Sequence, residues 1–309
     1  MKFDLLQIGV FPPAAQTLID AEFHCHSLDE INRDDALRTS IRGIITRSNA
    51  EVPATVIERL PSLAIIATSG VGFDLIPVDI ATSRGIVVTN TPDVLNTAVA
   101  ELCIGMLFAL LRRIPEADRF VKSGAWKSRA FPMATSLAGK QVGIVGLGRI
   151  GKEIARRLAP FDVKLSYFGR TDQHLSWQFE PDLHSLARTS DILIVTSPGG
   201  RDTARMIDAP VLDALGPDGY LINIARGSVV DQGALIDALS RRTIAGAALD
   251  VFDNEPDIDP RFFDLENAVL TPHVGSATTE TRLAMARLTL DNLHQFFKDG
   301  RTLTPVNAS

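Results

Sequence analysis

Hydrophobic residues along the chain form two kinds of run that alternate from end to end. Short runs rich in Val, Ile and Leu have the length of β-strands, and the longer amphipathic runs between them have the length of helices. This alternation predicts parallel sheets assembled from strand, helix and strand units. The predicted strands lie at Leu5–Phe11, Gly43–Ser48, Leu63–Gly70, Ile86–Asn90, Gln141–Gly146, Lys164–Phe168, Asp191–Ser197, Tyr220–Ala225, Ile244–Val251 and Ala268–Gly275.

A long helix-like run at residues 97–121 divides the first four strands from the last six. Ten strands exceed what one such sheet usually needs, and a length of 309 residues is typical of two domains. We therefore expect an α/β protein with two Rossmann-like parallel-sheet domains and a boundary near Leu95. The most apolar part of the run, Leu102–Leu111, is followed by two arginines and is too short to cross a bilayer.

The composition argues against a nucleic-acid-binding protein and against a secreted one. The net charge of −6, without any run of like charge, provides no basic surface for nucleic acid. Asp4 and two prolines interrupt the amino-terminal stretch, where a signal peptide needs an unbroken apolar core. The two cysteines, Cys25 and Cys103, lie far apart, which is typical of proteins in a reducing compartment. These features predict a cytoplasmic protein.

Two histidines, His24 and His26, flank Cys25 at a spacing that places both imidazoles on one face of a strand. No second group of ligands accompanies them in the sequence, so a coordination sphere would be incomplete. We therefore expect a solvent-facing strand here and no metal site.

Three glycines, Gly146, Gly148 and Gly151, stand directly after a predicted strand and directly before a predicted helix. In this context the first permits a tight turn, the second lets backbone N–H groups approach a pyrophosphate, and the third lets the helix pack on the strand. The anion then lies at the positive amino terminus of the helix. An ordinary glycine-rich turn is the alternative, but the flanking elements favour a dinucleotide site.

The next predicted strand ends where NAD-binding chains usually carry an acid that binds the ribose hydroxyls. Here Gly169, Arg170 and Thr171 follow instead, and Arg170 lies 19 positions beyond Gly151. A cation beside a hydroxyl and a glycine suits a 2′-phosphate. We therefore expect NADP as the cofactor, with NADPH preferred over NADH. The alternative is that Arg170 is a solvated surface residue.

Three polar residues, Arg226, Glu255 and His273, lie at the ends of later apolar strands. Ligands of open α/β sheets bind at the carboxyl ends of strands, so we expect these side chains to converge beside a bound nicotinamide. A cation, a carboxylate and an imidazole together supply what hydride transfer to a carbonyl requires.

The segments that carry these residues resemble the D-isomer-specific 2-hydroxyacid dehydrogenase family over nearly the whole chain. The resemblance rests on GLGRIG, INIARGSVVD, LDVFDNEP and LTPHVGSAT, in that order. The segments VTNTPDVL, SGAWK, YFGRT and DALGPDGYLINIARG further resemble the NADP-dependent hydroxypyruvate, glyoxylate and hydroxyphenylpyruvate reductase branch.

The resemblance implies a dinucleotide-binding domain at residues 96–275, inserted into a substrate domain made of residues 1–95 and 276–309, with a cleft between the two. It also implies roles for the three polar residues. Arg226 would bind the carboxylate of a 2-oxo acid and polarise its carbonyl, and His273 would donate the proton. Glu255 would keep His273 charged and oriented, since a nearby carboxylate favours imidazolium.

The same resemblance implies the remaining site residues. The cofactor would contact Gly146, Leu147, Gly148, Arg149, Ile150, Gly151, Gly169, Arg170, Thr171, Ser197, Ile224, Ala225, Asp250 and Gly275. The substrate would contact Arg47, Val71, Gly72, Arg226 and His273. Two places depart from the usual family pattern, namely Asn96, where relatives usually have Thr, and the loop at Ser197–Gly200.

The resemblance implies an oxidoreductase that reduces glyoxylate or hydroxypyruvate to (R)-2-hydroxy acids. Aromatic 2-oxo acids and 2-ketogluconate are alternative substrates, because Phe73, Leu75, Trp126 and Phe131 would either admit an aryl group or merely pack. An NAD(P)-sensing, corepressor-like binding protein and a formate dehydrogenase are alternatives on the same fold. The full set of three polar residues favours an enzyme, and Glu255 argues against the formate enzyme.

The run Ala98–Leu111 carries apolar residues on more than one helical face. This pattern favours a homodimer in which a second subunit covers the helix. Burial between the two domains of one chain is the alternative.

Overall fold

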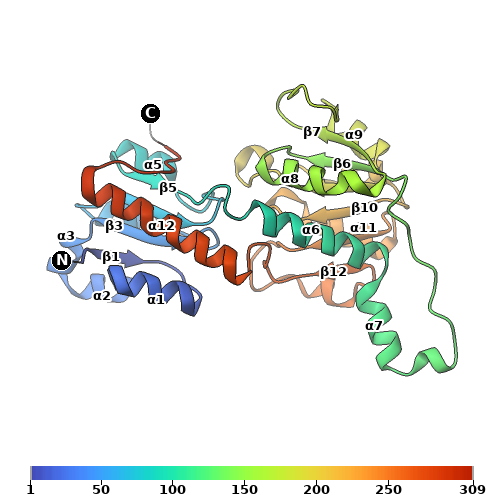
Figure 1. Cartoon of the computed structure of the whole chain (residues 1–309), viewed down its shortest axis with the longest axis horizontal. Helices are drawn as coiled ribbons and strands as arrows, with labels where there is room; N and C mark the ends of the chain where they lie inside the picture. Colours follow the sequence, from blue (N-terminus) through green and yellow to red (C-terminus); the bar gives the residue numbers. More distant parts are fainter. Residues whose placement is uncertain (1, 308–309) are drawn as a thin grey trace. The chain divides into compact units, whose positions relative to one another are not determined.

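The computed structural model describes residues 2–307 and divides the chain into two compact units (Figure 1). One unit contains the residues up to Leu95 together with those from Ser276 on, and the other contains Asn96–Gly275. Each unit has a parallel sheet and a hydrophobic core of its own. All ten strands predicted from the sequence are confirmed, with ends that differ by a few residues.

The first unit is built on a five-stranded parallel sheet in the order β2-β1-β3-β4-β5. Leu5 and Ile45 point to one face of this sheet, where they pack against α1 and α12. Leu6 and Ile44 point to the opposite face, which α2, α3, α4 and α5 cover. Because both faces are buried, β3 and β4 carry successive apolar residues, Ile44 and Ile45 in one and Ile65, Ile66 and Ala67 in the other. The elements are β1 (Asp4–Gln7), α1 (Pro13–Glu22), β2 (His24–His26), α2 (Leu28–Arg33), α3 (Asp35–Ser40), β3 (Gly43–Arg47), α4 (Ala54–Arg59), β4 (Ile65–Ser69), α5 (Val78–Ser83), β5 (Val87–Thr89) and α12 (Thr279–Asp299).

The second unit is built on a seven-stranded parallel sheet in the order β12-β11-β10-β9-β6-β7-β8. Helices α9, α10 and α11 pack on one face through a core that includes Leu186, Leu212 and Leu235. The chain proceeds from β6 to β8 in one direction and then returns to β9, on the other side of β6, to proceed the opposite way. Ligands of such sheets bind where the strand order reverses.

The elements of this unit begin with α6 (Asn96–Leu111), α7 (Ile114–Lys122), β6 (Gln141–Val145), α8 (Arg149–Leu158), β7 (Lys164–Phe168), β8 (Gln178–Phe179), α9 (Leu183–Thr189) and β9 (Ile192–Val195). They continue with α10 (Ala209–Leu215), β10 (Tyr220–Asn223), α11 (Gln232–Arg241), β11 (Gly246–Leu249) and β12 (Ala268–Leu270). Short 3₁₀ turns lie at Ala125–Lys127, Ala159–Phe161, Arg201–Thr203, Gly227–Val229 and Pro260–Asp264.

The helix-like run predicted at residues 97–121 is two helices rather than one, so that prediction is wrong in this respect. Helix α6 ends at Leu111 and α7 begins at Ile114, with Arg113 in the left-handed conformation between them (φ 54°). Pro115 lies in the first turn of α7. Proline has no N–H for a continuing helix and restricts the residue before it, so the chain ends one helix and starts another.

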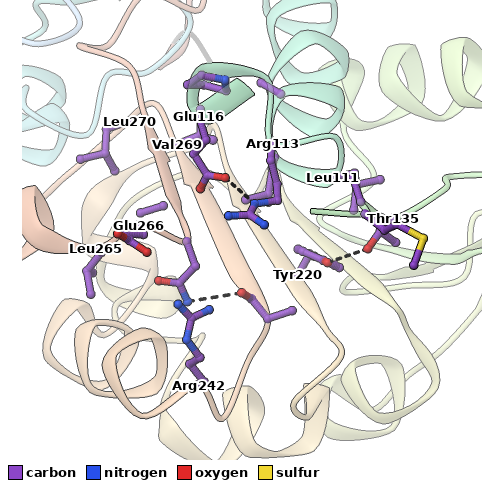
Figure 2. Close-up of a pocket in the computed structure, with 18 of the residues that line it drawn as sticks. Leu111, Arg113, Glu116, Thr135, Tyr220, Arg242, Leu265, Glu266, Val269 and Leu270 are labelled. Atoms are coloured by element: carbon purple, nitrogen blue, oxygen red, sulfur yellow. Dashed lines mark hydrogen bonds and ion pairs between the residues drawn. The ribbon is translucent and has the colours of Figure 1, made fainter. Parts of the chain in front are cut away.

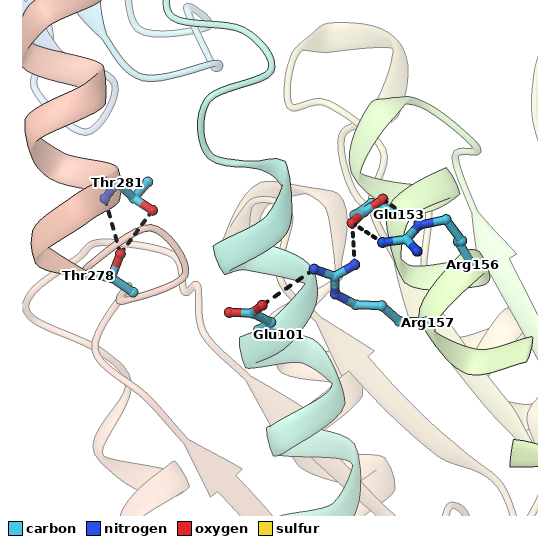
Figure 3. Close-up of polar contacts among 6 residues, drawn as sticks. All are labelled: Glu101, Glu153, Arg156, Arg157, Thr278 and Thr281. Atoms are coloured by element: carbon cyan, nitrogen blue, oxygen red, sulfur yellow. Dashed lines mark hydrogen bonds and ion pairs between the residues drawn. The ribbon is translucent and has the colours of Figure 1, made fainter. Parts of the chain in front are cut away.

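Helices α6 and α8 pack side by side and are joined by an ion pair (Figure 3). Arg157 on α8 lies 3.3 Å from the Glu101 carboxylate on α6, measured between Nη2 and Oε1, and it also pairs with Glu153 one turn earlier. The buried residues of α6, which include Cys103, Met106 and Leu110, lie within this unit. Leu102, Ile104 and Phe108 on the same helix are only half-buried.

The short strand β2 holds the two histidines that flank Cys25. The side chain of His26 contacts Asp4 on β1, with 2.7 Å between Nε2 and Oδ1, while His24 is exposed. Within residues 2–307, no group of three or more His, Cys, Asp or Glu side chains is arranged to hold a metal ion. In the same part of the chain, no helix combines the length and the apolar character needed to span a bilayer.

Candidate active site

Residues predicted for the cofactor and the catalytic groups lie at the carboxyl ends of six strands of the second unit. The glycine loop follows β6, Arg170 follows β7, Ser197 follows β9, and Arg226 follows β10. The loop after β11 carries Asp250 and Glu255, and the loop after β12 carries His273. Since all these strands are parallel, their carboxyl ends lie along one edge of the sheet.

The glycine loop has the shape that a pyrophosphate requires. Gly146 has a φ of +94°, and a Cβ atom there would lie 2.8 Å from Cα of Ser197. A Cβ atom on Gly151 would lie 2.6 Å from the carbonyl oxygen of Gly146, so helix and strand pack too closely for any side chain. Gly148 faces open space, and no side chain caps the amino terminus of α8. The helix terminus is thus accessible to an anion, and these residues fit a dinucleotide.

The loop after β7 adjoins the glycine loop. The Gly146 N–H donates to the carbonyl of Phe168, the last residue of β7, at 2.9 Å. Arg170 and Thr171 follow and are exposed. This part of the unit therefore presents a guanidinium and a hydroxyl next to the turn that fits the pyrophosphate.

His273 and Glu255 form a hydrogen-bonded pair. His273 Nδ1 lies 2.6 Å from Glu255 Oε2, and the side chains are 27% and 26% exposed. The other carboxylate oxygen, Oε1, accepts the N–H of Phe252 at 2.8 Å. Burial alone would raise the pKa of Glu255, but the hydrogen bond and charge of His273, with smaller contributions from the Phe252 amide and Arg226, hold that pKa below its ordinary value.

Arg226 lies on a turn that a buried amide side chain holds in place. Asn223, the last residue of β10, is 1% exposed and donates from Nδ2 to the carbonyl of Arg226 at 2.9 Å. Asn223 Oδ1 accepts the N–H of Ala225 at 3.1 Å. The Arg226 guanidinium in turn donates to the Ala225 carbonyl at 2.9 Å. These bonds fix the backbone from which the guanidinium projects.

The turn of Arg226 rests directly on the loop that carries Glu255. A Cβ atom placed on Gly227 would overlap the backbone of Phe252 and Asp253. The charge of Arg226 is also felt by the Glu255 carboxylate. The structure therefore brings the three predicted catalytic residues into one neighbourhood, with all three on the same unit.

Asp250 holds the loop that carries His273. Its Oδ1 accepts the Thr271 hydroxyl at 2.6 Å and the Val274 N–H at 2.8 Å, and its Oδ2 accepts the Gly275 N–H at 2.8 Å. Burial raises the pKa of Asp250, and these three hydrogen bonds oppose the shift. The carboxylate thus holds the Thr271 side chain before His273 and the backbone after it, and His273 itself adopts a left-handed conformation (φ 53°).

Sequence reasoning missed Asn223 and Thr271, whose side chains hold the two catalytic turns. A signal for both was present, because each is a polar residue at the end of an apolar strand segment. Buried polar groups are almost always hydrogen-bonded, so such a residue indicates a bond to a neighbouring turn.

The residues predicted to contact the substrate from the first unit also lie at or just after the ends of strands. Val71 and Gly72 come after β4, in a loop held by two bonds: Asn90 Nδ2 donates to the Val71 carbonyl at 2.8 Å, and the Thr91 N–H donates to the Gly70 carbonyl at 2.9 Å. Arg47 ends β3 and donates to the carbonyl of Val10 at 2.7 Å. Burial lowers the pKa of the Arg47 guanidinium.

Comparison with protein families identifies the chain. Residues 104–275 match the family described as D-isomer specific 2-hydroxyacid dehydrogenase, NAD binding domain. The chain belongs to the D-isomer-specific 2-hydroxyacid dehydrogenase family. The matched segment contains the glycine loop, Arg226, Glu255 and His273, so the family and the geometry concern the same residues.

Relatives of this dehydrogenase include two curated reductases and a solved structure. A 2-ketogluconate reductase of Gluconobacter oxydans (strain 621H) is 43% identical over 306 residues, which is 99% of each chain. Glyoxylate/hydroxypyruvate reductase A HPR2 of Arabidopsis thaliana is 47% identical over 270 residues, 87% of this chain and 86% of that one. The NADPH-dependent glyoxylate/hydroxypyruvate reductase of Sinorhizobium meliloti, solved in complex with NADP and malonate, has a TM-score of 0.94 and 42% identity, covering 99% of this chain and 97% of that one.

The second unit of the dehydrogenase also has a cavity of about 610 Å³ that none of the predicted catalytic residues line (Figure 2). It is lined by the end of α6, by α7 and by β12, and Tyr220, the first residue of β10, lies in its wall. The Tyr220 hydroxyl bonds Thr135 at 3.0 Å, and Arg113 pairs with Glu116. Since Tyr220 marks the amino end of β10, this cavity is separate from the catalytic edge of the sheet.

Proposed function

We propose that this dehydrogenase reduces 2-oxo acids of the glyoxylate and hydroxypyruvate type to (R)-2-hydroxy acids, with NADPH as the hydride donor. The observation that carries the proposal is the 2.6 Å contact between His273 Nδ1 and Glu255 Oε2, with Arg226 on the adjoining turn. Relatives named as glyoxylate/hydroxypyruvate and 2-ketogluconate reductases support the class of substrate. Aromatic 2-oxo acids and 2-ketogluconate are the alternatives within that class.

In the proposed reaction His273 acts as the general acid. Glu255 occupies Nδ1, so Nε2 is the nitrogen that presents the proton, and the carboxylate favours the charged ring. Arg226 binds the substrate carboxylate and draws electron density toward the carbonyl oxygen. A bound reduced nicotinamide would supply the hydride for the carbonyl carbon. His273 gives its proton to the carbonyl oxygen, so one C–H and one O–H bond form as the C=O double bond becomes single.

We assign cofactor binding to the unit Asn96–Gly275 and substrate binding to the other unit together with Arg226 and His273. The open helix terminus beyond Gly148 supports the pyrophosphate site. The backbone amides of Val71 and Gly72 are assigned to the substrate carboxylate, since glycine-containing turns bind anions through their N–H groups. Arg47 is assigned to the distal end of the substrate.

The substrate assignment is tested by a panel assayed with NADPH: glyoxylate, hydroxypyruvate, phenylpyruvate and 2-ketogluconate. We expect glyoxylate and hydroxypyruvate to have the highest kcat/KM. Where the product is chiral, chiral chromatography should show only the R enantiomer. An S product would contradict the family mechanism. Absence of turnover with every acid, combined with binding of NADPH, would instead favour the corepressor-like alternative.

The cofactor assignment is tested at Arg170. A charge-assisted hydrogen bond contributes about 1.5–3 kcal/mol, so Arg170→Ala should lower kcat/KM for NADPH by roughly ten- to a hundredfold. NADH has no phosphate at this position and should be little affected. Arg188→Ala, which removes an exposed arginine on α9 of the same unit, is the control. A wild type that prefers NADH, or an equal loss with both cofactors, would show that Arg170 is a surface residue.

We also propose a homodimer, supported by the chain between α7 and β6. This segment extends away from the sheet of its unit before it returns to start β6 (Figure 1). It carries Trp126 and Met133, which are 69% and 98% exposed. The cavity of about 610 Å³ lies beside the same segment (Figure 2). The segment thus presents exposed apolar side chains and, at Met133, also lines the hollow, which suits the self-complementary surface of a two-fold dimer. We propose a cytoplasmic location on the basis of the two free cysteines.

A further inference from the structure

The loop that carries Arg170 is attached to the glycine loop at both of its ends. At its start, the Gly146 N–H donates to the Phe168 carbonyl at 2.9 Å. At its end, Gln173 Nε2 donates to the carbonyl of Leu147 at 2.8 Å. Arg170 and Thr171 lie between these two bonds. The segment is therefore a short span whose two ends are held by neighbouring residues of one turn.

A third attachment comes from beneath the loop. Tyr167 on β7 is fully buried, and its hydroxyl accepts the Gln173 N–H at 2.8 Å while it donates to Asp172 Oδ1 at 2.8 Å. The ring also packs against Phe179 on β8. Because Tyr167 is fixed by the sheet, the loop that its hydroxyl binds is fixed as well.

Asp172, two positions after Arg170, is the acid nearest to it in sequence. Its carboxylate is held by hydrogen bonds to other residues of the loop and the sheet. Its Oδ1 accepts both the Tyr167 hydroxyl and the His174 N–H at 2.8 Å, and its Oδ2 lies 3.4 Å from His174 Nδ1. A carboxylate free to turn toward a bound phosphate would repel it. Because it is bonded to Tyr167 and to the His174 backbone, this carboxylate is not free to turn in that way.

We propose that Gln173 and Tyr167 are positioning residues for the 2′-phosphate of the cofactor. They hold the Arg170 loop against the glycine loop and keep the Asp172 carboxylate engaged. The preference for a 2′-phosphate then depends on the loop's geometry as well as on the charge of Arg170. The inference rests on the proposed use of NADPH. Its experiment distinguishes failure of the positioning role from failure of the NADPH assignment.

The test uses nucleotides without nicotinamide, so that binding is measured apart from turnover. Titration calorimetry on the full-length protein measures Kd for adenosine 2′,5′-bisphosphate and for adenosine 5′-monophosphate. The Kd of the monophosphate divided by the Kd of the bisphosphate measures recognition of the 2′-phosphate. The variants are Gln173→Ala, which removes the bond to Leu147, and Tyr167→Phe, which keeps the packed ring and removes only the hydroxyl. Gln178→Ala, an exposed glutamine on the adjacent strand β8, is the matched control.

We expect Gln173→Ala and Tyr167→Phe each to lower this ratio by roughly three- to tenfold, the effect of one hydrogen bond. Affinity for adenosine 5′-monophosphate should remain near the wild-type value, which also shows that the glycine loop is intact, and Gln178→Ala should change neither affinity. Wild-type ratios in both variants, with a loss only in Arg170→Ala, would overturn the positioning role and leave the NADPH assignment standing. An equal loss of both nucleotides would also overturn it. A wild type without any gain from the 2′-phosphate would overturn the NADPH assignment and this inference together.

Discussion

At the scale of the residue, the pair formed by His273 and Glu255 determines how the reaction should respond to pH. The 2.6 Å contact places a carboxylate against the imidazole, and that carboxylate stabilises the charged ring. The depressed pKa of Glu255 means that the carboxylate stays ionised at and below the pH at which most glutamates begin to take up a proton. The reduction needs the protonated ring, so loss of the carboxylate should make that form less available.

We predict that Glu255→Gln shifts a limb of the pH profile of kcat/KM for reduction, because the carboxylate that bonds Nδ1 of the general acid His273 is lost. His273→Ala and Arg226→Ala should instead lower turnover by on the order of a hundredfold at every pH, since each removes a group that acts in the transition state. Rate profiles between acid and alkaline pH distinguish these effects. Glu266→Gln, at an exposed position beside the separate cavity, is the control. An unchanged profile for Glu255→Gln would mean that Glu255 does not act through His273.

At the scale of the element, contacts between loops rather than single side chains assemble the catalytic group. Arg226 and Glu255 belong to loops after different strands, β10 and β11, and these loops meet where Gly227 lies against the backbone of Phe252. Asn223 and Asp250 hold the turns on either side. The position of each catalytic residue therefore depends on the packing of its neighbour's loop.

We predict that Gly227→Ala lowers kcat/KM by on the order of a hundredfold, because a methyl group there must push the Arg226 and Glu255 loops apart. The free energy of unfolding should fall by about 1–3 kcal/mol from the same overlap. Gly233→Ala is a matched control, since a Cβ atom on that glycine of α11 meets only one atom, at 3.5 Å. It should leave activity unchanged and leave stability equal or slightly higher, as alanine favours a helix. Activity and urea unfolding measure both effects, and wild-type activity in Gly227→Ala would refute the role of this contact.

At the scale of the whole molecule, two features of the second unit bear on the proposed dimer, namely helix α6 and the segment that follows α7. Helix α6 buries Cys103, Met106 and Leu110, while Leu102, Ile104 and Phe108 on it are only half-buried. Trp126 and Met133 remain exposed on the segment between α7 and β6. Large apolar side chains that stay exposed are typical of an interface.

We predict that static light scattering at micromolar concentration gives twice the chain mass of 33.5 kDa. The double substitution Trp126→Ser and Met133→Ser should shift the mass toward that of one chain, because it removes the protruding apolar groups. Phe263→Ser is the matched control, since Phe263 is 68% exposed in the same unit but lies on a different segment. A wild-type mass of one chain would rule out the dimer, and a dimeric double variant would place the interface elsewhere.

Much of this architecture could be predicted from the sequence because its signals are local. A strand buried on both faces must be apolar at successive positions, as at Ile144 and Val145, so the longer strands of the sheets could be found from their own residues. The two-residue strand β8 has no such signal and was not predicted. The glycine loop was equally accessible, because Gly146 and Gly151 each leave no space for a side chain within a single turn. The break after α6 was missed although Pro115 marked it, since the apolar pattern continued on both sides.

What the tertiary structure alone decided are the contacts between residues far apart in the chain. Parallel strands bring their carboxyl ends together whatever the length of chain between them, so Thr271 meets Asp250 and Gly227 meets Phe252 without any pattern in the intervening sequence. Gln173 meets Leu147 in the same way, across 26 positions. Local sequence determines which residues can form a strand or a turn. Only the packing of those strands, driven by burial of their apolar faces, determines which polar side chains then find each other.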